Sequence, residues 1–312
     1  MYFIYIAPDF CSLCNDPDMH TIRLCARILT LAGILMLFSS CPRKAVVEPY
    51  SFFVAGHTYG VKEKPIPGLH MPFVADFETL NNYPDLHFGV LTGDIVYYSR
   101  DTSWSNVDRQ LQKLNVPVYF TTGNHDEGHK QVYQERYGIT YYSFEQGTDL
   151  CIVLNPGLGG WNIWNEQMNF LKAQMEKVPH YKHVFLFFHH LVWWDDDNEY
   201  SNYRPNSLDG RAPTVNFLSE VLPMLQACGR PVYCFAGDVG AAGHPTVFFA
   251  DKRDNVYLIA SGMGNQRKDN YLIVDVYPET GVEIKIRWLQ GQDAGPSFPA
   301  DEELPFGVRL FP

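Results

Sequence analysis

Five short hydrophobic runs each end in a residue that can bind a metal ion, and this repeated pattern constrains the fold more than any other feature. The runs begin at residues 51, 87, 116, 184 and 232 and are rich in Val, Phe and Tyr. Such runs are typical of strands that are buried on both faces. In an open α/β sheet, ligands gather outside the carboxyl ends of the strands. We therefore expect one crevice to receive the polar residues at these ends: His57, Asp94, Asn124, His125, His189 and Asp238.

Segments with helical spacing lie between the runs. Apolar residues recur at intervals of three or four within residues 107–114, 168–178 and 217–225, which predicts helices with one core face. The alternation of strands and helices favours a layered α/β fold with a largely parallel sheet. Near the C-terminus, residues 271–277 and 282–288 flank a turn, which predicts an antiparallel hairpin with one apolar and one polar face. We expect this hairpin to extend a second sheet of the same domain.

The N-terminal segment carries a separate signal. Arg23 and Arg27 precede an apolar stretch, residues 28–38, that is too short to span a bilayer comfortably. Two serines and Cys41 follow it. This arrangement is similar to a bacterial lipoprotein signal, with Cys41 as the lipidated first residue of the mature chain. The alternatives are a buried core helix and a single anchor helix that is retained.

The lipoprotein interpretation divides the chain at Cys41. Residues 1–40 would form the signal segment, with the lipoprotein-type signal at 19–40 and residues 1–18 as an extension if Met19 is the true start. Residues 41–312 would form a single domain, which is long enough for one large core. We expect this domain to lie in the bacterial cell envelope, facing the periplasm or the exterior. Its membrane contact would be made only through the lipid anchor on Cys41.

Charge and cysteine content exclude some classes of function. The chain has a formal net charge of −11 and no basic run, which argues against nucleic acid as the main partner. Beyond Cys41 the sequence holds only Cys151, Cys228 and Cys234, each in or beside an apolar run. Their irregular spacing fits neither a disulfide framework nor a zinc knuckle, so we expect buried free thiols.

The order of the polar motifs resembles that of a known family. Gly93-Asp94 is followed thirty residues later by Gly-Asn-His-Asp at 123–126, then by a strand-end histidine and by a glycine-led turn at 237–240. This order resembles the calcineurin-like metallophosphoesterases over about residues 50–290, so that 41–312 would be one metallophosphoesterase-like domain. The resemblance implies a four-layer α/β/β/α sandwich with mixed sheets and two metal ions at the strand ends. It also implies hydrolysis of a phosphate mono- or diester, in a small molecule or a polymer.

The resemblance assigns a role to each matching residue. Asp94 would bridge two cations about 3.5 to 4 Å apart, so that both stabilise displacement at phosphorus. Asn124 would offer a carbonyl oxygen to one cation. His125 would not bind metal but would donate a proton or hydrogen bond to the leaving group or phosphate. His189 matches the next ligand position, and His190 is the alternative because the sequence does not resolve this doublet.

Two motifs depart from the family pattern. The family opens with Asp-x-His where this chain has Ala55-Gly56-His57, and it closes with Gly-His-x-His where this chain has Asp238 and then Gly240. One metal site therefore keeps only His57 and Asp94 and is expected to be empty, weak or rebuilt. The other site is expected to be sound and to prefer Mn²⁺, Mg²⁺ or Fe²⁺, because it keeps three oxygen donors and one imidazole. Its ligands would be Asp94, Asn124, His189 and Asp238.

Several residues near the motifs are candidates for supporting roles. Asp126, His190 and His244 are candidates either to contact and orient the metal ligands or to replace a missing one, and Tyr59 could also approach the weakened site. The alternative for Tyr59 and His244 is a polar loop position that faces water. An acidic cluster within residues 193–200 could hold Ca²⁺, although a solvated loop is the default interpretation. Two functional hypotheses follow: a phosphoesterase with a modified centre, or a degenerate family member that binds a phosphorylated or glycan ligand.

Overall fold

The computed structural model describes residues 48–61, 67–241, 243–289 and 308–310. All of these belong to one compact unit. The expected signal segment and the expected boundary at Cys41 therefore lie outside the described residues. Among the helices that are described, none has the length and apolar character needed to cross a bilayer.

In the described part of the chain two six-stranded sheets form the framework, and the five hydrophobic runs all become strands. The first sheet has the order β12-β11-β10-β1-β2-β3, and the second has the order β4-β5-β6-β7-β9-β8. In the first sheet the bounds are β1 Tyr50–Ala55, β2 Leu86–Thr92, β3 Val118–Thr121, β10 Asn270–Tyr277, β11 Gly281–Trp288 and β12 Val308–Leu310. In the second they are β4 Tyr142–Gln146, β5 Asp149–Val153, β6 Val184–Phe187, β7 Val232–Ala236, β8 Phe248–Arg253 and β9 Val256–Ser261.

The distribution of the strands differs from the expectation in two respects. The five runs do not share one sheet: β1, β2 and β3 pair in parallel in the first sheet, and β6 and β7 pair in parallel in the second. The predicted hairpin, β10 and β11, is present, but it pairs through β10 with β1 in the first sheet. Moreover, β10 is buried on both faces up to its last residue, because one face meets the second sheet and the other meets helices. The prediction that β10 has one polar, exposed face is therefore wrong.

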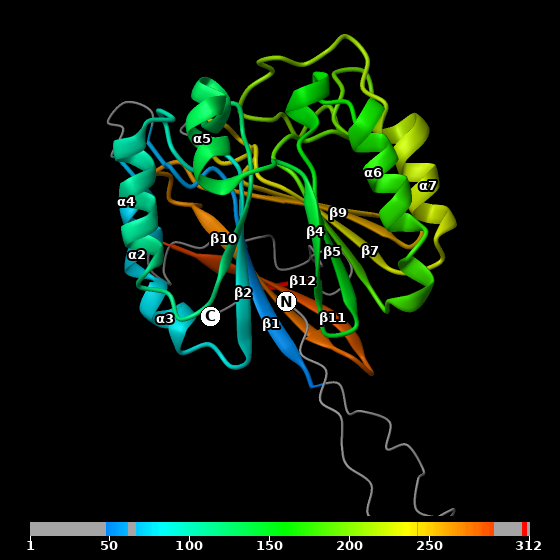
Figure 1. Cartoon of the computed structure of the whole chain (residues 1–312), viewed down its shortest axis with the longest axis horizontal. Helices are drawn as coiled ribbons and strands as arrows, with labels where there is room; N and C mark the ends of the chain where they lie inside the picture. Colours follow the sequence, from blue (N-terminus) through cyan, green and yellow to red (C-terminus); the bar gives the residue numbers. More distant parts are fainter. Residues whose placement is uncertain (1–47, 62–66, 242, 290–307, 311–312) are drawn as a thin grey trace, which may run out of the picture. The chain divides into compact units, whose positions relative to one another are not determined.

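Helices cover the outer face of each sheet, which completes an α/β/β/α sandwich (Figure 1). The first sheet packs on α2 (Met71–Ala75), α3 (Phe77–Asn81) and α4 (Asp101–Leu111). The second packs on α6 (Asn165–Met175) and α7 (Leu222–Ala227), which follows a π-helical turn at Phe217–Val221. The short α5 (Lys130–Tyr137) follows the loop after β3. The predicted helical stripes thus correspond to α4, to α6 and to the π-turn with α7.

Aromatic side chains fill the space between the two sheets. The ring of Phe52 in β1 stacks on Phe88 in β2 at 4.7 Å and meets Phe185 of β6 edge-on at 5.0 Å. Each pair of this kind contributes about 0.5–1.5 kcal/mol beyond the burial of its area. Among the described cysteines, Cys151 and Cys234 are buried free thiols, as predicted, and Cys228 is free but only partly buried. The two sheets are thus fixed face to face, and their strand ends meet at one edge.

Candidate metal centre

Glycines allow the strand ends of the two sheets to approach one another. A β-carbon on Gly237, after β7, would lie 2.0 Å from the carbonyl oxygen of Thr92 at the end of β2. One on Gly56, after β1, would lie 2.3 Å from the carbonyl oxygen of Ser261 at the end of β9. Since real side chains never come this close to backbone, only glycine fits at these positions. The residues that follow these glycines are therefore brought into one place.

Backbone strain marks the same place. His57 and Asp94 follow Gly56 and Gly93, and both have positive φ angles, of 53° and 51°. Non-glycine residues in this region are uncommon, and they cluster at functional sites where the surrounding structure holds them. The strand-to-loop turns after β1 and β2 thus present two candidate ligands at the cost of local strain.

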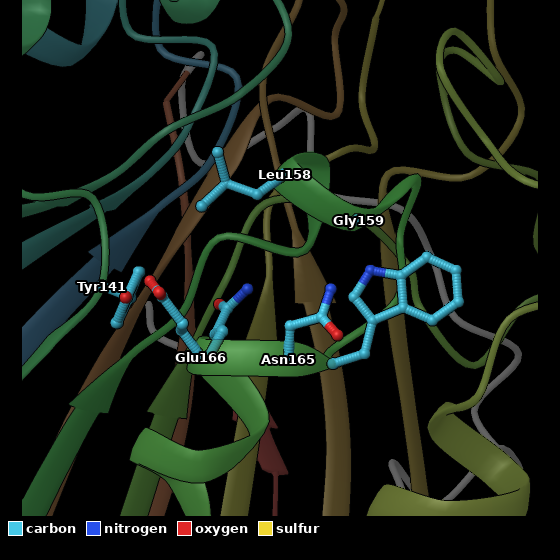
Figure 2. Close-up of a pocket in the computed structure, with 7 residues that line it drawn as sticks. Tyr141, Leu158, Gly159, Asn165 and Glu166 are labelled. Atoms are coloured by element: carbon cyan, nitrogen blue, oxygen red, sulfur yellow. The ribbon is translucent and has the colours of Figure 1, made fainter.

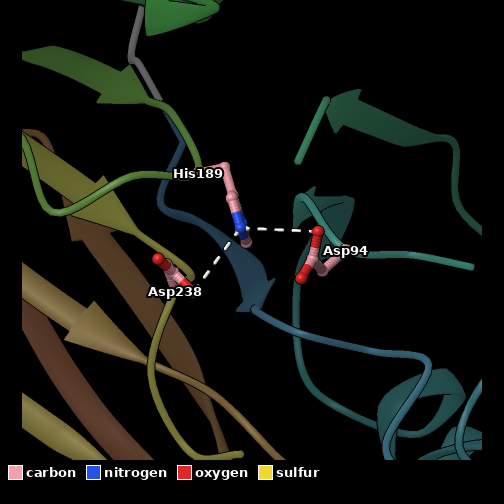
Figure 3. A group of neighbouring side chains, drawn as sticks. All are labelled: Asp94, His189 and Asp238. Atoms are coloured by element: carbon pink, nitrogen blue, oxygen red, sulfur yellow. Dashed lines mark ion pairs between the residues drawn. The ribbon is translucent and has the colours of Figure 1, made fainter. Parts of the chain in front are cut away.

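The centre is built around Asp94, His189 and Asp238, whose side chains converge from both sheets (Figure 3). The Nε2 atom of His189 lies 3.5 Å from Oδ1 of Asp94 and 3.7 Å from Oδ1 of Asp238. One ligand atom from each of the three residues lies within 4.8 Å of the others. On the other side of Asp94, Nε2 of His57 lies 3.8 Å from Oδ2. Asp94 thus stands between two histidines, one from each sheet.

Backbone carbonyls set the orientation of both histidines. The Nδ1 atom of His189 lies 2.9 Å from the carbonyl oxygen of Thr92, and Nδ1 of His57 lies 2.6 Å from that of Met263. A carbonyl only accepts, so Nδ1 must carry the hydrogen, and the lone pair of Nε2 then faces Asp94. This is the tautomer and the carbonyl contact that metal-binding histidines show.

Several buried polar atoms of the centre have no hydrogen-bond partner among the described residues. They are Nε2 of His189 and both carboxylate oxygens of Asp238. A buried polar atom left unpaired costs about 1–3 kcal/mol, and a charged one more. These atoms, one imidazole nitrogen and the two oxygens of one carboxylate, are of the kind that a divalent cation would bind. The residues present therefore fit the metal that the sequence predicts.

The electrostatics of the centre also favour a cation. Burial opposes ionisation of Asp94, but His189, His57 and His125 outweigh it and hold the pKa of Asp94 below its usual range. Burial and then the charge of Asp94 raise the pKa of Asp238 well above the usual value. Burial lowers the pKa of His57 to about 4, which keeps this imidazole neutral. A bound metal ion would stabilise the ionised form of Asp238 and so offset both its burial and the repulsion from Asp94.

His125 lies over the centre without entering the cluster of ligand atoms. Its backbone N–H donates to Oδ1 of Asp94 at 3.1 Å, and its Nδ1 lies 2.9 Å from the carbonyl oxygen of Tyr97. His125 lines a cavity of about 340 Å³ together with His57, Tyr59 and Asp94. It is partly exposed there, as a group that must reach a substrate would be.

Asn124 and His190 face a second, smaller cavity of about 190 Å³. Asn124 is adjacent to Gly123, where a β-carbon would lie 2.2 Å from Oδ1 of Asp94, so the backbone just before Asn124 contacts the cluster. His190 is buried against the ring of Trp161 at 4.9 Å, and burial lowers its pKa well below the usual value. Of the histidine doublet, His189 therefore enters the cluster, and His190 does not.

Asp126 supports the site instead of acting as a substitute ligand. One carboxylate oxygen accepts the backbone N–H groups of Ile95 and Val96, at 2.9 and 3.1 Å, and the other accepts that of Gly123 at 2.9 Å. Because backbone donors engage both oxygens, the structure favours a supporting role for Asp126 over the alternative in which it replaces a missing metal ligand. The side chain ties the loop after β2 to the loop after β3.

The candidates for a rebuilt second site lie nearby but do not form a cluster. His244 and Tyr59 both line the 340 Å³ cavity, and burial followed by the charge of Asp94 raises the pKa of Tyr59 above its usual range. Within the described ranges, His244 belongs to no group of three His, Cys, Asp or Glu residues with ligand atoms within 4.8 Å. A histidine side chain cannot stand at Gly240, where φ is 89° and a β-carbon would lie 2.5 Å from the carbonyl carbon of Gly262.

Two other features lie outside the centre. The acidic residues Asp195, Asp196 and Asp197 lie close together, but the guanidinium of Arg211 pairs with Asp195 at 2.5 Å, so this carboxylate is already neutralised. A third cavity, of about 330 Å³, is shown in Figure 2 and contains none of the predicted ligands. Its lining includes Tyr141, Leu158, Trp164 and Glu166.

Sequence reasoning missed the groups that orient the ligands. The carbonyl oxygens of Thr92, Tyr97 and Met263 fix three histidines, and a backbone carbonyl leaves no signature in residue type. It also missed Asn206, which lines the 340 Å³ cavity from the long loop after β6. The length of that loop was the only signal that could have pointed to it.

Comparison with known proteins agrees with this geometry. The family model of the calcineurin-like phosphoesterases matches residues 70–261. A purple acid phosphatase from yellow lupin (Lupinus luteus) seeds superimposes with a TM-score of 0.53 at 12% identity, over 78% of this chain and 52% of the phosphatase. The chain thus spans about half the length of that enzyme.

A phosphopantetheinyl hydrolase from Mycobacterium tuberculosis matches with a TM-score of 0.40 at 11% identity, over 70% of this chain and 91% of the hydrolase. No curated protein matches the sequence significantly. The likeness to the lupin enzyme concerns the fold, and the family follows from the matched model, which covers more than half of the chain. The chain belongs to the calcineurin-like phosphoesterases, a family of α/β/β/α proteins that use divalent metals and act on phosphate esters.

Proposed function

We propose that the domain hydrolyses a phosphate mono- or diester at a centre with one strong divalent metal site. The observation that carries this proposal is the set of buried, unpaired atoms on His189 and Asp238 that face Asp94. With the carbonyl oxygen of Asn124, these side chains supply three oxygens and one nitrogen, a set suited to Mn²⁺, Mg²⁺ or Fe²⁺. A bound metal of this kind polarises a phosphoryl oxygen and activates water at neutral pH.

Different residues would bind the metal, orient its ligands and deliver the proton. Asp94, His189 and Asp238 would hold the metal, and the carbonyl of Thr92 keeps the ring of His189 in place. His125 stands at the cavity, where its Nε2 can deliver a proton to the departing oxygen while Nδ1 stays on the carbonyl of Tyr97. The buried walls limit water around the reacting groups, which strengthens these interactions.

Elemental analysis combined with a substrate screen tests the proposal. We expect about one Mn, Mg or Fe ion per chain and turnover of at least one class of phosphate mono- or diester. The same preparation must give both results, because metal without turnover would favour the second hypothesis. A protein that neither retains a divalent metal nor cleaves any ester would contradict the proposal.

The second candidate function is binding without turnover. It is favoured by Ala55 and Gly240, which stand where the family has metal ligands. In that case the centre would recognise a phosphorylated or glycan ligand and release it unchanged. Retention of His125 at the cavity favours the enzyme, since a scaffold would have no use for a proton donor there.

We also propose that the protein acts in the bacterial cell envelope, anchored by a lipid on Cys41. This rests on the basic, apolar and small-residue order of residues 19–41, which lies outside the described part of the chain. Replacing Cys41 by Ser should leave the precursor unprocessed and move the protein out of its normal membrane fraction. Pulse labelling with a radioactive fatty acid, with Cys228→Ser as the control, measures this. Unchanged processing of Cys41→Ser would contradict the lipid anchor.

A further inference from the structure

We propose that Asn206 and His244 bind the phosphoryl oxygens of the substrate, on the side of Asp94 where the metal ligands are missing. This inference rests on the proposed function and deepens it. The chain would use hydrogen-bond donors at the place where a two-metal centre uses its second cation. Neither residue belongs to a motif that the family shares with this sequence.

Both side chains reach the same cavity from loops outside the framework. Asn206 lies in the long loop after β6, and His244 lies in the turn that follows β7. They line the 340 Å³ cavity together with His57, Asp94 and His125. The two loops thus add side chains to a cavity that the strand-end residues also line, and a phosphate held by the metal would have further oxygens for these side chains to bind.

The orientation of Asn206 is fixed by two hydrogen bonds. Its Oδ1 accepts the backbone N–H of Ala241 at 2.9 Å, and its own backbone N–H donates to the carbonyl oxygen of Asp238 at 2.9 Å. The Nδ2 group is thereby turned away from Ala241, and it is buried with no hydrogen-bond partner in the described part of the chain. A buried amide donor without a partner is unfavourable unless a ligand satisfies it.

His244, in the neighbouring turn, also has a buried polar atom without a hydrogen-bond partner among the described residues. Its backbone N–H donates to the carbonyl oxygen of Ala241 at 2.9 Å, so both candidate residues are held to the same position. The Nδ1 atom of His244 is buried, and no residue that the structure describes forms a hydrogen bond with it. Ser207 also lines the cavity, and its hydroxyl accepts the backbone N–H of Asp209, which leaves the hydroxyl hydrogen for another acceptor.

The chemistry of these groups fits an oxyanion better than a second metal ion. An amide NH₂ group only donates hydrogen bonds and cannot ligate a cation. His244 belongs to no cluster of metal-ligating atoms within the described residues, and its ring can instead donate to phosphate. The carboxylates of Asp94 and Asp209 also line the cavity, so an anion would bind only after a cation neutralises Asp94. We therefore expect metal first and phosphate second.

Calorimetric titration with inorganic phosphate tests the inference on the full chain loaded with Mn²⁺. Hydrogen bonds to a charged partner are among the stronger ones, so Asn206→Ala and His244→Ala should each raise the Kd for phosphate by about tenfold or more. Asn206→Asp, which keeps the acceptor for Ala241 but replaces the donors by a carboxylate, should weaken binding further. Asn202→Ala in the same loop and His180→Ala, both exposed positions, are the controls and should leave the Kd unchanged.

Metal content, measured on the same samples, separates the alternatives. The Mn content per chain should be unchanged in Asn206→Ala and His244→Ala. Loss of a metal ion in His244→Ala would overturn the inference in favour of a rebuilt second metal site. An unchanged Kd in Asn206→Ala, or no phosphate binding by the unmodified protein, would also overturn it. Phosphate binding that depends on Asn206 in a protein that cleaves no ester would sustain the inference while refuting the proposed function.

Discussion

His57, His125 and His189 each direct one ring nitrogen at a backbone carbonyl, and this shared arrangement decides which nitrogen remains for chemistry. In every case Nδ1 is engaged, so Nε2 is left to face a ligand or a substrate. The expected roles of these histidines, metal ligand or proton donor, differ because the surroundings of Nε2 differ. For His189 it meets two carboxylates, and for His125 it meets the open cavity.

At this scale the proton-donor role of His125 makes a sharp prediction. General acid catalysis contributes roughly 10² to 10⁴ in rate and matters most for poor leaving groups. His125→Ala should therefore keep its metal but lose far more activity on an alkyl phosphate ester than on a nitrophenyl ester. Parallel kcat/KM measurements on the two esters check this. Equal losses on both would show that His125 binds phosphate and does not deliver a proton.

The ligand set makes a second prediction at the scale of the residue. Asp238→Asn keeps the size of the side chain but removes its charge, so the affinity for the metal should fall by at least about 100-fold. Removal of a buried carboxylate whose pKa is raised by burial should leave the metal-free protein as stable or more stable. Metal analysis and thermal unfolding measure the two effects. The control is Asp196→Ala, in the exposed acidic cluster, and two equally tight ions in the unmodified protein would refute the single-site model.

At the scale of the elements, the loop between β9 and β10 helps to position a candidate ligand of the site. The carboxylate of Asp269 accepts the backbone N–H groups of Gly264, Asn265 and Gln266 at 2.8 to 2.9 Å, and it pairs with His70 at 3.0 Å. This loop carries the Met263 carbonyl that orients His57. The position of one candidate ligand is thus determined by a loop that contributes no side chain to the centre.

The close contact between the strand ends predicts that replacement by alanine destabilises the protein at Gly237 but not at Gly128. Gly237→Ala would place a methyl group 2.0 Å from the carbonyl oxygen of Thr92, so β2 and β7 must separate at their ends. We expect a loss of about 3 kcal/mol in the free energy of unfolding, together with weaker metal binding, because Asp94 and Asp238 follow these strands. Gly128→Ala, where nothing lies within 4 Å of the added carbon, is the matched control. Denaturant unfolding with equal stability for the two variants would contradict the packing argument.

At the scale of the whole described unit, the centre joins the two sheets. Asp94 follows β2 of the first sheet, whereas His189 and Asp238 follow β6 and β7 of the second. Both sheets are already fixed by the aromatic core between them. A metal ion at this edge would add a further link and would relieve the repulsion between Asp94 and Asp238.

Removal of the metal should therefore lower the stability of the unit as a whole. A ligand at 100 times its Kd stabilises a protein by about 2.7 kcal/mol, which corresponds to roughly 5–11 °C in Tm for a domain of this size. Chelation followed by dialysis should lower Tm by about this amount, and added Mn²⁺ should restore it. Asp238→Asn should show no such shift, and an equal shift in that variant would place the stabilising metal elsewhere.

The sequence by itself determined seven of the twelve described strands (β1, β2, β3, β6, β7, β10 and β11) and the candidate ligands at their ends. Apolar runs of this kind are strands because their side chains must be buried on both faces, and a polar residue directly after such a run lies at a sheet edge. The Gly-Asn-His-Asp tetrapeptide and the order of the motifs were enough to indicate the family. These features are local, so they can be seen without knowledge of the packing.

Only the tertiary structure decided how these pieces combine. The allocation of β1 and β6 to different sheets depends on long-range pairing, which the hydrophobic pattern does not encode. The choice of His189 over His190 followed from which ring meets Asp94 and which meets Trp161. The support role of Asp126 followed from backbone donors on two separate loops. Residue type sets what a side chain can do, but its partners come from distant segments, and these are fixed only when the chain is folded.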